Sequence, residues 1–422
     1  MLNVVTSLLS NPSVIMAFVA LLGLLLLRKT TSEVISGTLK TLLGFLILQA
    51  GAGLIVNALI PFSGIFTEAF HLTGFVAEDN ALVAAVQTVL GFETSMILIF
   101  SFIINIVLAR VTKWKYIFLT GHMMFSFAGT MAIVLHQMGV TGWTAIAIGA
   151  GVQGVSSIVF PAIAQPFVRK ITGNNDVAFG FWGSSPIWFS GWLGGLVGDK
   201  SKSCEDIKVP NAFAFLKDMS VLMSIVMIVV YLGTNLYAGS AIVAKYSGGA
   251  NVYVFSLMTA LGFVAGILVL LQGVRMFLAE LVPAFKGISE KLVPGAIPAL
   301  DVPIFYAFAP TATTIGFLFA VVGGLIATAV STTMGHVILP SVIGLFFMGG
   351  AAGVFGDKMG GIRGAIVAGL LLGFIFSIVP VLAYPLVDLT SYGINGLWFA
   401  STDAIIVVVI MRLVGMVFGI GL

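Results

Sequence analysis

Long apolar runs, separated by short polar stretches, extend along the whole chain. Each run is about twenty residues long, which is the length that an α-helix needs to cross the hydrocarbon core of a bilayer. A membrane β-barrel is excluded, because its strands would appear as short stretches of alternating polarity. The pattern predicts an all-α polytopic membrane protein with about eleven crossings, at 12–27, 41–60, 92–110, 116–137, 142–164, 219–238, 251–272, 304–327, 330–349, 363–385 and 396–418.

Three segments between these runs are too polar and too rich in glycine and proline to span a bilayer, yet too apolar for solvated loops. Segments 61–91 and 283–303 fit hairpins or half-helices buried in protein, where non-helical backbone is tolerated at membrane depth. Segment 177–192 fits either a third re-entrant hairpin or an aromatic belt at the membrane interface.

One pattern of residues occurs twice in the chain, with an offset of 222 or 223 residues between its copies. Its members are the pairs Gln49/Gln272, Pro61/Pro283, Phe62/Phe285, Gly64/Gly287, Ile65/Ile288, Glu68/Glu290 and Asp79/Asp301. An odd number of predicted crossings separates the two copies, so we expect them to be inverted in the membrane. Inverted repeats place a substrate site near the bilayer midplane, where broken helices from the two halves meet.

The repeat predicts the domain organisation. We expect a single membrane domain over residues 1–422, which contains two inverted repeats. Its parts are repeat 1 at about 12–164, a cytoplasmic or re-entrant connection at 165–218, repeat 2 at about 219–385 and a final helix at 396–418.

The composition agrees with a membrane protein and excludes several classes of site. The chain is 59% apolar and 8% charged, with a mean hydropathy of +1.15, whereas soluble domains contain about 25% charged residues. A single cysteine, Cys204, excludes a disulfide framework and a thiolate metal cluster. Four widely spaced histidines give no haem or multi-metal pattern, so we expect no cofactor and no metal. No nucleotide-binding motif is present, and no nucleic-acid partner is expected.

The basic residues predict the orientation of the chain. Of the 19 Lys and Arg residues, 17 fall in the predicted loops on one side, at 28–40, 110–115, 165–218, 273–303 and 350–363. Positive charge gathers on the cytoplasmic side of membrane proteins. The N-terminus is therefore expected outside and the C-terminus in the cytoplasm.

Acids at membrane depth are the first candidates for a functional site, because a charge inside a bilayer is costly. Asp79 and Asp301 are related by the repeat, and each follows a presumed hairpin. Each acid could instead cap the next half-helix. The carboxylate of Asp301 could accept a hydrogen bond from a sugar hydroxyl, or act as the general base when that hydroxyl attacks phosphorus. Asn80 and His122 are further candidates, although a lone histidine is more often a packed residue.

Other polar residues are expected to have no role in binding. Asp388 and Asp403 lie near the predicted outer ends of crossings, so we expect both to be interfacial. A solvated amphipathic helix on the cytoplasmic side is predicted from Arg275, Glu280, Lys286, Glu290 and Lys291.

Several stretches resemble one known family. LLRKTTSEVISGTLKTLLGFLILQAGAG, FLTGHMMF and LLQGVRMFLAELVPAFKGISEKLVPGAIPALD are similar to the IIC membrane component of the ascorbate-specific phosphotransferase system. The resemblance implies a homodimer in the bacterial cytoplasmic (inner) membrane, in which each protomer has a core domain and a V-motif dimerisation domain. It also implies cytoplasmic IIA and IIB partners, which receive phosphate from phosphoenolpyruvate through enzyme I and HPr.

The resemblance transfers a substrate site only in part. Asp301, followed by Pro303, matches the acidic substrate-contacting position, and His122 lies in the matching TGH motif. Ala52 fits the close-packed segment after Gln49. The chain departs from the family elsewhere in the expected pocket: Asp79-Asn80 replace Thr-Tyr, Ser126 replaces glutamine, and Gly183-Ser184-Ser185 replace His-Gln-Gln.

The expected function is therefore sugar import by a phosphotransferase IIC component, with ascorbate as the default substrate. Because ascorbate is an anion, an added aspartate in the pocket would disfavour it, and a different sugar or a neutral polyol is the alternative. An ion-coupled secondary transporter, with Asp79 and Asp301 as its cation site, is a second alternative. A membrane-embedded enzyme is a further class, but the sequence shows no recognisable constellation of a nucleophile or of metal ligands.

Overall fold

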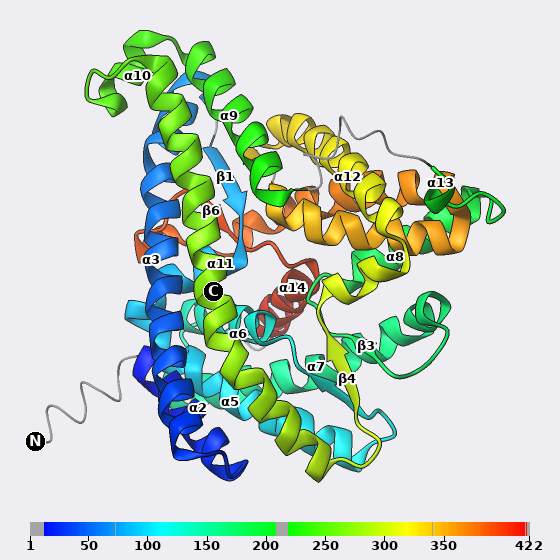
Figure 1. Cartoon of the computed structure of the whole chain (residues 1–422). Coiled ribbons are helices and arrows are strands. Elements are labelled where there is room, and N and C mark those ends of the chain that lie inside the picture. The colour runs from blue at the N-terminus through cyan, green and yellow to red at the C-terminus, as the bar shows by residue number, and fades with distance from the viewer. Residues whose placement is uncertain (1–11, 72, 208–217, 340, 418, 420–422) are drawn as a thin grey trace, which may run out of the picture.

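The computed structural model describes residues 12–71, 73–207, 218–339, 341–417 and 419. Its helices form two groups that lie side by side (Figure 1). The first group is built around α3 (Thr31–Phe70) and α11 (Val252–Leu292), which run next to each other along the height of the molecule. The same group contains α2 (Pro12–Leu26), α9 (Met219–Ala238) and α10 (Ser240–Ser247).

Reciprocal glycine contacts hold α3 and α11 close together. A side chain at Gly51 would overlap the backbone of Leu270, and one at Gly273 would overlap the backbone of Leu48. Small residues let the backbones of membrane helices approach each other in this way. The two glycines are 222 residues apart, as are the two leucines, so the contact relates equivalent positions of the repeated pattern.

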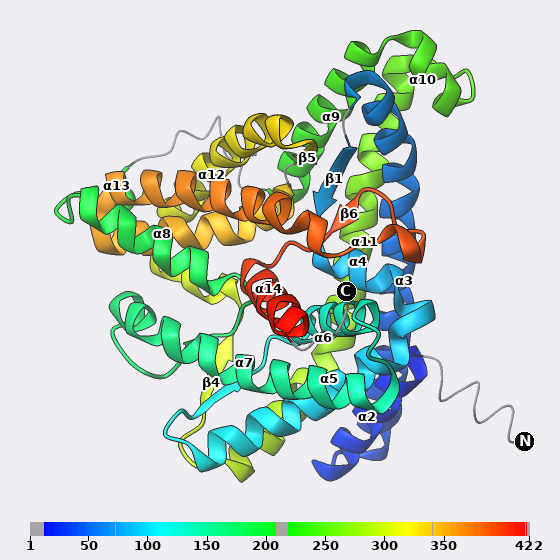
Figure 2. The same cartoon turned by 180° about the vertical axis from the view of Figure 1, so that it is seen from behind.

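The second group contains the other helices, which Figure 2 shows from behind. Helix α6 is almost wholly buried at its centre, next to α5 and α7. Helix α13 is interrupted at Gly360 and Gly361, where the backbone leaves the helical conformation. The members of this group are α4 (Asp79–Ala85), α5 (Gln87–Val111), α6 (Gly121–Gln137), α7 (Gly142–Thr172), α8 (Ser184–Val197), α12 (Pro310–Ser331), α13 (Val342–Ala383) and α14 (Thr402–Val417).

Two small parallel sheets lie where the helices break. In the first, β1 (Thr73–Ala77) lies between β5 (His336–Leu339) and β6 (Leu397–Trp398). In the second, β4 (Ile297–Leu300) lies between β2 (Tyr116–Phe118) and β3 (Ala178–Phe179). Each central strand thus comes from one half of the chain and its two neighbours from the other half. The strands satisfy the non-helical backbone inside the protein, as membrane depth requires.

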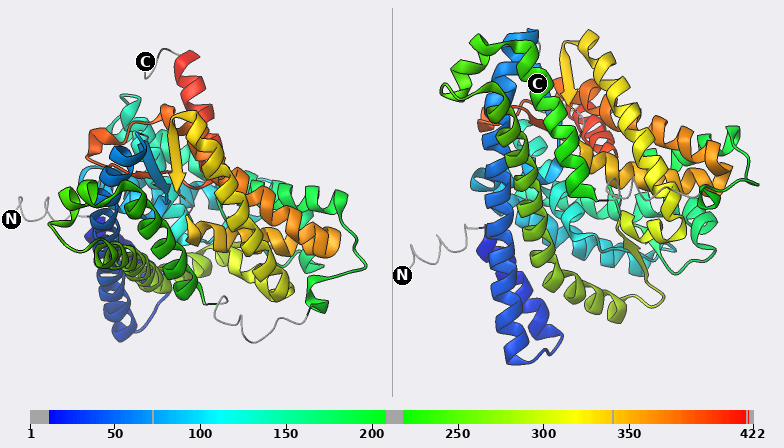
Figure 3. Two further views of the ribbon diagram at one scale, coloured as in Figure 1. Left: turned by 90° about the horizontal axis from the view of Figure 1, so that it is seen from above. Right: turned by 45° about the horizontal axis from the view of Figure 1, so that its top comes forward.

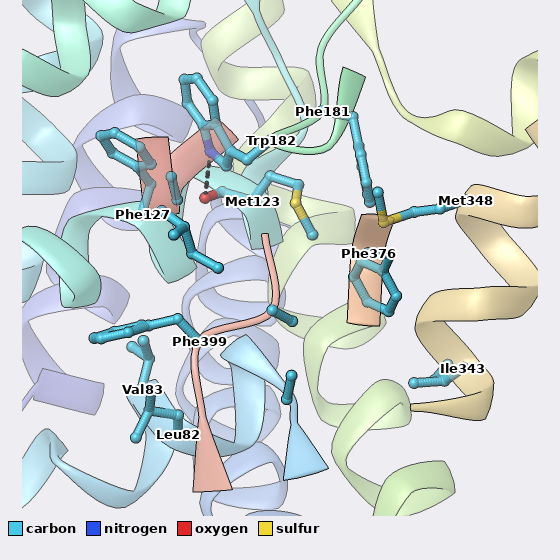
Figure 4. Close-up of a cluster of buried hydrophobic side chains, with 14 of the residues drawn as sticks. Leu82, Val83, Met123, Phe127, Phe181, Trp182, Ile343, Met348, Phe376 and Phe399 are labelled. Carbon is cyan, nitrogen blue, oxygen red and sulfur yellow. Dashed lines mark hydrogen bonds between the residues drawn. The ribbon is translucent and has the colours of Figure 1, made fainter. Parts of the chain in front are cut away.

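Aromatic packing fixes the segment that precedes α8. The Trp182 ring stacks on Phe118 and on Phe127, each with a centroid distance of 4.4 Å. Its indole Nε1 donates a hydrogen bond to the Met123 carbonyl at 2.8 Å, drawn in Figure 4. The start of α8 is therefore held against the start of α6. The buried residues Ala178–Ser184 contradict an interfacial belt for the first half of 177–192, although Phe189 and Trp192 are exposed.

Some of the predicted boundaries are wrong. The crossing predicted at 330–349 does not exist: α12 ends at Ser331, β5 follows, and α13 begins at Val342. The loop predicted at 350–363 is helical and contains the break in α13. Segments 61–91 and 283–303 begin as continuations of α3 and α11, and only then form a strand and a short helix.

The described helices are sufficient for a multi-pass membrane protein. Six are long and apolar enough to cross a bilayer, or seven if the bent pair α9 and α10 forms one span. The views in Figure 3 show the broken helices gathered beside the long α3–α11 pair.

Candidate functional site

A cavity of about 450 Å³ lies between the two helix groups. The ends of both sheets open onto it, and α11 contributes Arg275 and Ala279 on the opposite side. Phe181, Met348 and Phe376 lie close together in Figure 4 and form an apolar part of its wall. Of the residues expected to bind substrate, the cavity is lined by Asp79, Asn80, His122, Asp301 and Pro303.

The parallel pairing of β2 with β4 explains why His122 and Asp301 meet. Phe118 pairs with Ala299, so both strands leave the sheet at the same edge. Asp301 follows β4 directly, and His122 lies at the start of α6, four residues after β2. His122 Nε2 lies 3.7 Å from Asp301 Oδ2. The ends of parallel strands are a common place for ligand sites in open sheets, and the same geometry operates here.

Asp301 serves both as a helix cap and as a polar group of the cavity. Its Oδ1 accepts a hydrogen bond from the Val302 amide at 2.7 Å, at the start of the 3₁₀ helix Val302–Phe308. The carboxylate keeps Oδ2 on the side of His122, and its side chain is 36% exposed. The helix-cap reading of this residue therefore holds in the structure, and its place in the cavity wall leaves its role toward a substrate as a prediction.

Asp79 is held by the other half of the chain. Its Oδ1 accepts from the Ala400 amide at 2.8 Å and its Oδ2 from the Ser401 amide at 2.9 Å. The Ser401 hydroxyl also donates to Oδ2. The residue is 5% exposed, unlike its repeat-related counterpart Asp301. In this conformation the carboxylate fixes the loop before α14 and has little surface to offer a ligand.

Asn80 and Ser126 are partners of each other. The Ser126 hydroxyl donates to Asn80 Oδ1 at 2.8 Å, and both side chains are buried. Glu78 caps α4 by accepting from the Ala81 amide at 2.7 Å. Asn80 and Ser126, two residues that differ from the expected family pattern, thus hydrogen-bond to each other. Asn80 also lines the cavity.

Ser184 and Ser185 contact Asp403 and do not line the cavity. The Ser184 hydroxyl donates to Asp403 Oδ2 at 2.9 Å, and the Ser185 amide lies 3.3 Å from both carboxylate oxygens. The Asp403 amide in turn donates to the Trp182 carbonyl at 3.0 Å. Asp403 is fully buried, so its expected interfacial position is wrong. The carboxylate caps α8 from the other half of the chain, where the positive end of the helix dipole favours it.

Arg275 was missed by the sequence reasoning. It lies on α11, where it is exposed as the charge pattern predicts, and it also lines the cavity. Its place three residues after the repeated Gln272 was the available signal. Ala52 lies on α3, but its side chain is outside the described residues.

Cys204 has no sign of reactivity. It is fully buried in the short helix Cys204–Asp206, where the Asp357 carboxylate accepts from its amide at 2.6 Å. Burial, followed by the charge of Asp357, raises the pKa of the thiol, so the nucleophilic thiolate is disfavoured.

Residues 7–403 match the EIIC-GAT family, described as the sugar-specific permease component of the phosphotransferase system (PTS). The match covers most of the chain. The chain belongs to the EIIC-GAT family. It is also 28% identical, over 436 aligned positions, to a protein of Mycoplasma pneumoniae named as an ascorbate-specific PTS EIIC component. The alignment covers 88% of this chain and 64% of that relative, so the chain spans less than two thirds of the relative's length.

Membership in the EIIC-GAT family places the cavity in a multi-pass sugar permease of the phosphotransferase system. The resemblance of the sequence to a phosphotransferase IIC component is therefore confirmed.

Proposed function

We propose that this EIIC-GAT protein imports L-ascorbate, and that transport is coupled to phosphorylation of the sugar by a IIB protein. The observation that supports this most is the pair His122 and Asp301, which lines a cavity of about 450 Å³. A histidine and a carboxylate beside each other can hold a hydroxyl by donating to it and accepting from it. The relative named for ascorbate supports the choice of substrate.

The hydrogen bonds of Asp79, one of the residues that differ from the expected family pattern, also favour ascorbate. Three hydrogen-bond donors surround the Asp79 carboxylate, and these reduce its repulsion of an anion. Arg275 contributes a cation on the α11 side of the cavity. An anionic substrate could therefore lie with its charge toward Arg275 and a hydroxyl toward Asp301.

A neutral sugar or polyol is the second candidate, and one observation favours it. The cavity is lined by three carboxylates, Glu78, Asp79 and Asp301, but by a single arginine. An ion-coupled transporter, with Asp79 and Asp301 as its cation site, is the third. Since the Asp79 oxygens already bond Ala400 and Ser401, they would have to exchange these partners for the cation.

In the proposed reaction the protein positions the sugar for in-line transfer and forms no covalent bond itself. The sugar hydroxyl oxygen attacks phosphorus on phospho-IIB, the bond from phosphorus to the IIB side chain breaks, and the hydroxyl proton passes to Asp301 or His122. Most of the rate in phosphoryl transfer comes from positioning and electrostatics. The phosphate on IIB would come from phosphoenolpyruvate through enzyme I, HPr and IIA.

We further propose that the α3–α11 group forms the V-motif domain of a homodimer and that the second group forms the mobile core. We place the protein in the cytoplasmic membrane of a bacterium, with its N-terminus outside. Two observations support two inverted repeats. In each sheet the central strand comes from one half of the chain and its neighbours from the other half, and the glycine contacts between α3 and α11 are reciprocal. They also suggest wider repeats than the predicted ones, because α8 and α14 occupy equivalent places after β3 and β6.

Uptake of labelled ascorbate by cells that contain the protein with its IIA and IIB partners tests the proposal. Chemical analysis of the internal product should find phosphorylated ascorbate, and cells without IIB should accumulate none. Unmodified ascorbate inside, driven by an ion gradient, would contradict the coupled mechanism. If phosphorylated polyol accumulates in place of ascorbate, the mechanism holds and the substrate assignment is wrong.

A further inference from the structure

A second cavity, of about 420 Å³, lies at the end of α8 that is remote from the His122–Asp301 site. Three lysines from separate elements line it: Lys170 in the last turn of α7, Lys200 in the loop after α8, and Lys358 just before the break in α13. We propose that this cavity binds the phosphate of an anionic phospholipid headgroup.

The backbone brings two of these lysines together. The Asp199 amide donates to the Gly360 carbonyl at 2.9 Å, and the Ile362 amide donates to the Lys202 carbonyl at 2.8 Å. These bonds attach the loop after α8 to the break in α13, which Figure 2 shows side by side. Gly361 has a φ of 61°, in the left-handed region that glycine tolerates. Lys200 and Lys358 are thus held at one cavity by a fixed turn.

No carboxylate of the described residues neutralises these three lysines within 4.0 Å. The ion pairs in the described part of the chain are Lys29–Glu33, Lys40–Glu280, His122–Asp301 and Lys245–Glu68. Two carboxylates are adjacent to these lysines in sequence, and both are engaged elsewhere: Asp199 accepts from the Ser201 amide and hydroxyl, and Asp357 accepts from the Ser203 hydroxyl and the Cys204 amide. Three ammonium groups around one cavity repel one another, and a bound anion relieves that repulsion.

The surroundings of the cavity favour a lipid over a free phosphate ion. Trp192 and Leu196 line it and are 42% and 64% exposed, which gives an acyl chain an apolar surface beside the lysines. An aromatic row leads to it along α7 and α8, with ring contacts Phe167–Trp188, Trp188–Phe189 and Phe189–Trp192. Tryptophan and lysine at the ends of membrane helices mark the headgroup region. Basic pockets between membrane helices on the cytoplasmic side bind anionic headgroups.

Trp192 provides a spectroscopic test in the complete protein. The protein is placed in phosphatidylcholine nanodiscs that contain brominated phosphatidylglycerol or brominated phosphatidylcholine. The quenching of Trp192 is obtained by subtracting the signal of a Trp192→Phe variant. We expect quenching at a lower fraction of the anionic lipid than of the zwitterionic one, by about fivefold for each lysine that contacts the phosphate.

Removal of the lysine charges should abolish this preference. The variant Lys170→Gln/Lys200→Gln/Lys358→Gln should be quenched equally by both lipids. A matched variant with the same change in net charge, Lys113→Gln/Lys115→Gln/Lys291→Gln, should keep the preference. Equal quenching in the wild type, or an unchanged preference in the first variant, overturns the proposal.

Two further measurements separate other occupants of the cavity. If excess inorganic phosphate abolishes the lipid preference, the site binds a free anion and the lipid assignment is wrong. If the first lysine variant loses binding of phospho-IIB but keeps the lipid preference, the cavity is a protein docking site. In nanodiscs of phosphatidylcholine alone, both lysine variants should unfold at the wild-type temperature, because no anionic lipid contributes there.

Discussion

The carboxylate of Asp79 accepts a hydrogen bond from the amide of Ser401, 322 residues further along the chain, at 2.9 Å. The converse contact joins Asp403, in the second half, to Ser184 in the first half at 2.9 Å. Each half of the chain thus supplies an acid that holds the start of a broken helix in the other half. These two contacts hold helix starts that lie close to the His122–Asp301 cavity.

Removal of the Asp79 carboxylate should destabilise the protein. Asp79→Ala leaves the buried amides of Ala400 and Ser401 without their acceptor, at a cost of roughly 2–4 kcal/mol. The unfolding temperature of purified protein in detergent measures this effect. Asp388→Ala is the matched control, because its carboxylate lies in an exposed loop, and should change little. Equal stability of the two variants would show that the contact is unimportant.

Ser184 and Asp403 should be energetically coupled. Truncation of either residue breaks the same hydrogen bond, so the double variant Ser184→Ala/Asp403→Ala should lose less than the sum of the single variants. A double-mutant cycle on thermal unfolding should give a coupling of about 1–3 kcal/mol. Additive losses would mean that the two side chains act independently.

The glycines at the α3–α11 crossing should be intolerant of substitution. Gly51→Ala and Gly273→Ala place a methyl group against the facing backbone and should each cost about 1–3 kcal/mol. Gly53→Ala is the control, since nothing lies within 4 Å of the added methyl group. Gly53→Ala should be neutral or slightly stabilising in the same unfolding measurement. Equal effects at all three positions would contradict the reciprocal contact.

Arg275 should contribute to recognition of an anionic substrate. Arg275→Gln removes the cation that lines the cavity on the α11 side, and the KM for ascorbate should rise roughly tenfold. Uptake kinetics with ascorbate and with a neutral polyol as competitor measure the change. Competition by the polyol should become relatively stronger in the variant. An unchanged KM for ascorbate would remove Arg275 from the site.

The sequence predicted the residues of the cavity better than their contacts. The apolar runs and the repeat identified Asp79 and Asp301 as equivalent positions, and the strand ends do bring Asp301 to His122. The different roles of the two acids depend on what the opposite half presents to them, which no local pattern contains. The amides of Ala400 and Ser401 donate hydrogen bonds to Asp79, whereas Asp301 Oδ2 lies 3.7 Å from His122 Nε2, beyond hydrogen-bond distance.

The errors have the same physical origin. Asp403 precedes an apolar run, so hydropathy places it at a membrane surface, yet α14 begins in the interior at the buried start of α8. Gly360 and Gly361 resemble a loop in the sequence, but α8 packs against them and the helix continues on both sides. Long-range packing decided both cases.

The binding of ascorbate to purified protein tests the central claim most directly. Calorimetric titration should detect binding to the wild type and to the control variant Asp388→Asn, which alters an exposed carboxylate. Asp301→Asn should bind at least tenfold more weakly, because the amide cannot replace the charged acceptor, while its unfolding temperature stays close to that of the wild type. Wild-type affinity in Asp301→Asn would contradict the assignment of the His122–Asp301 cavity as the sugar site.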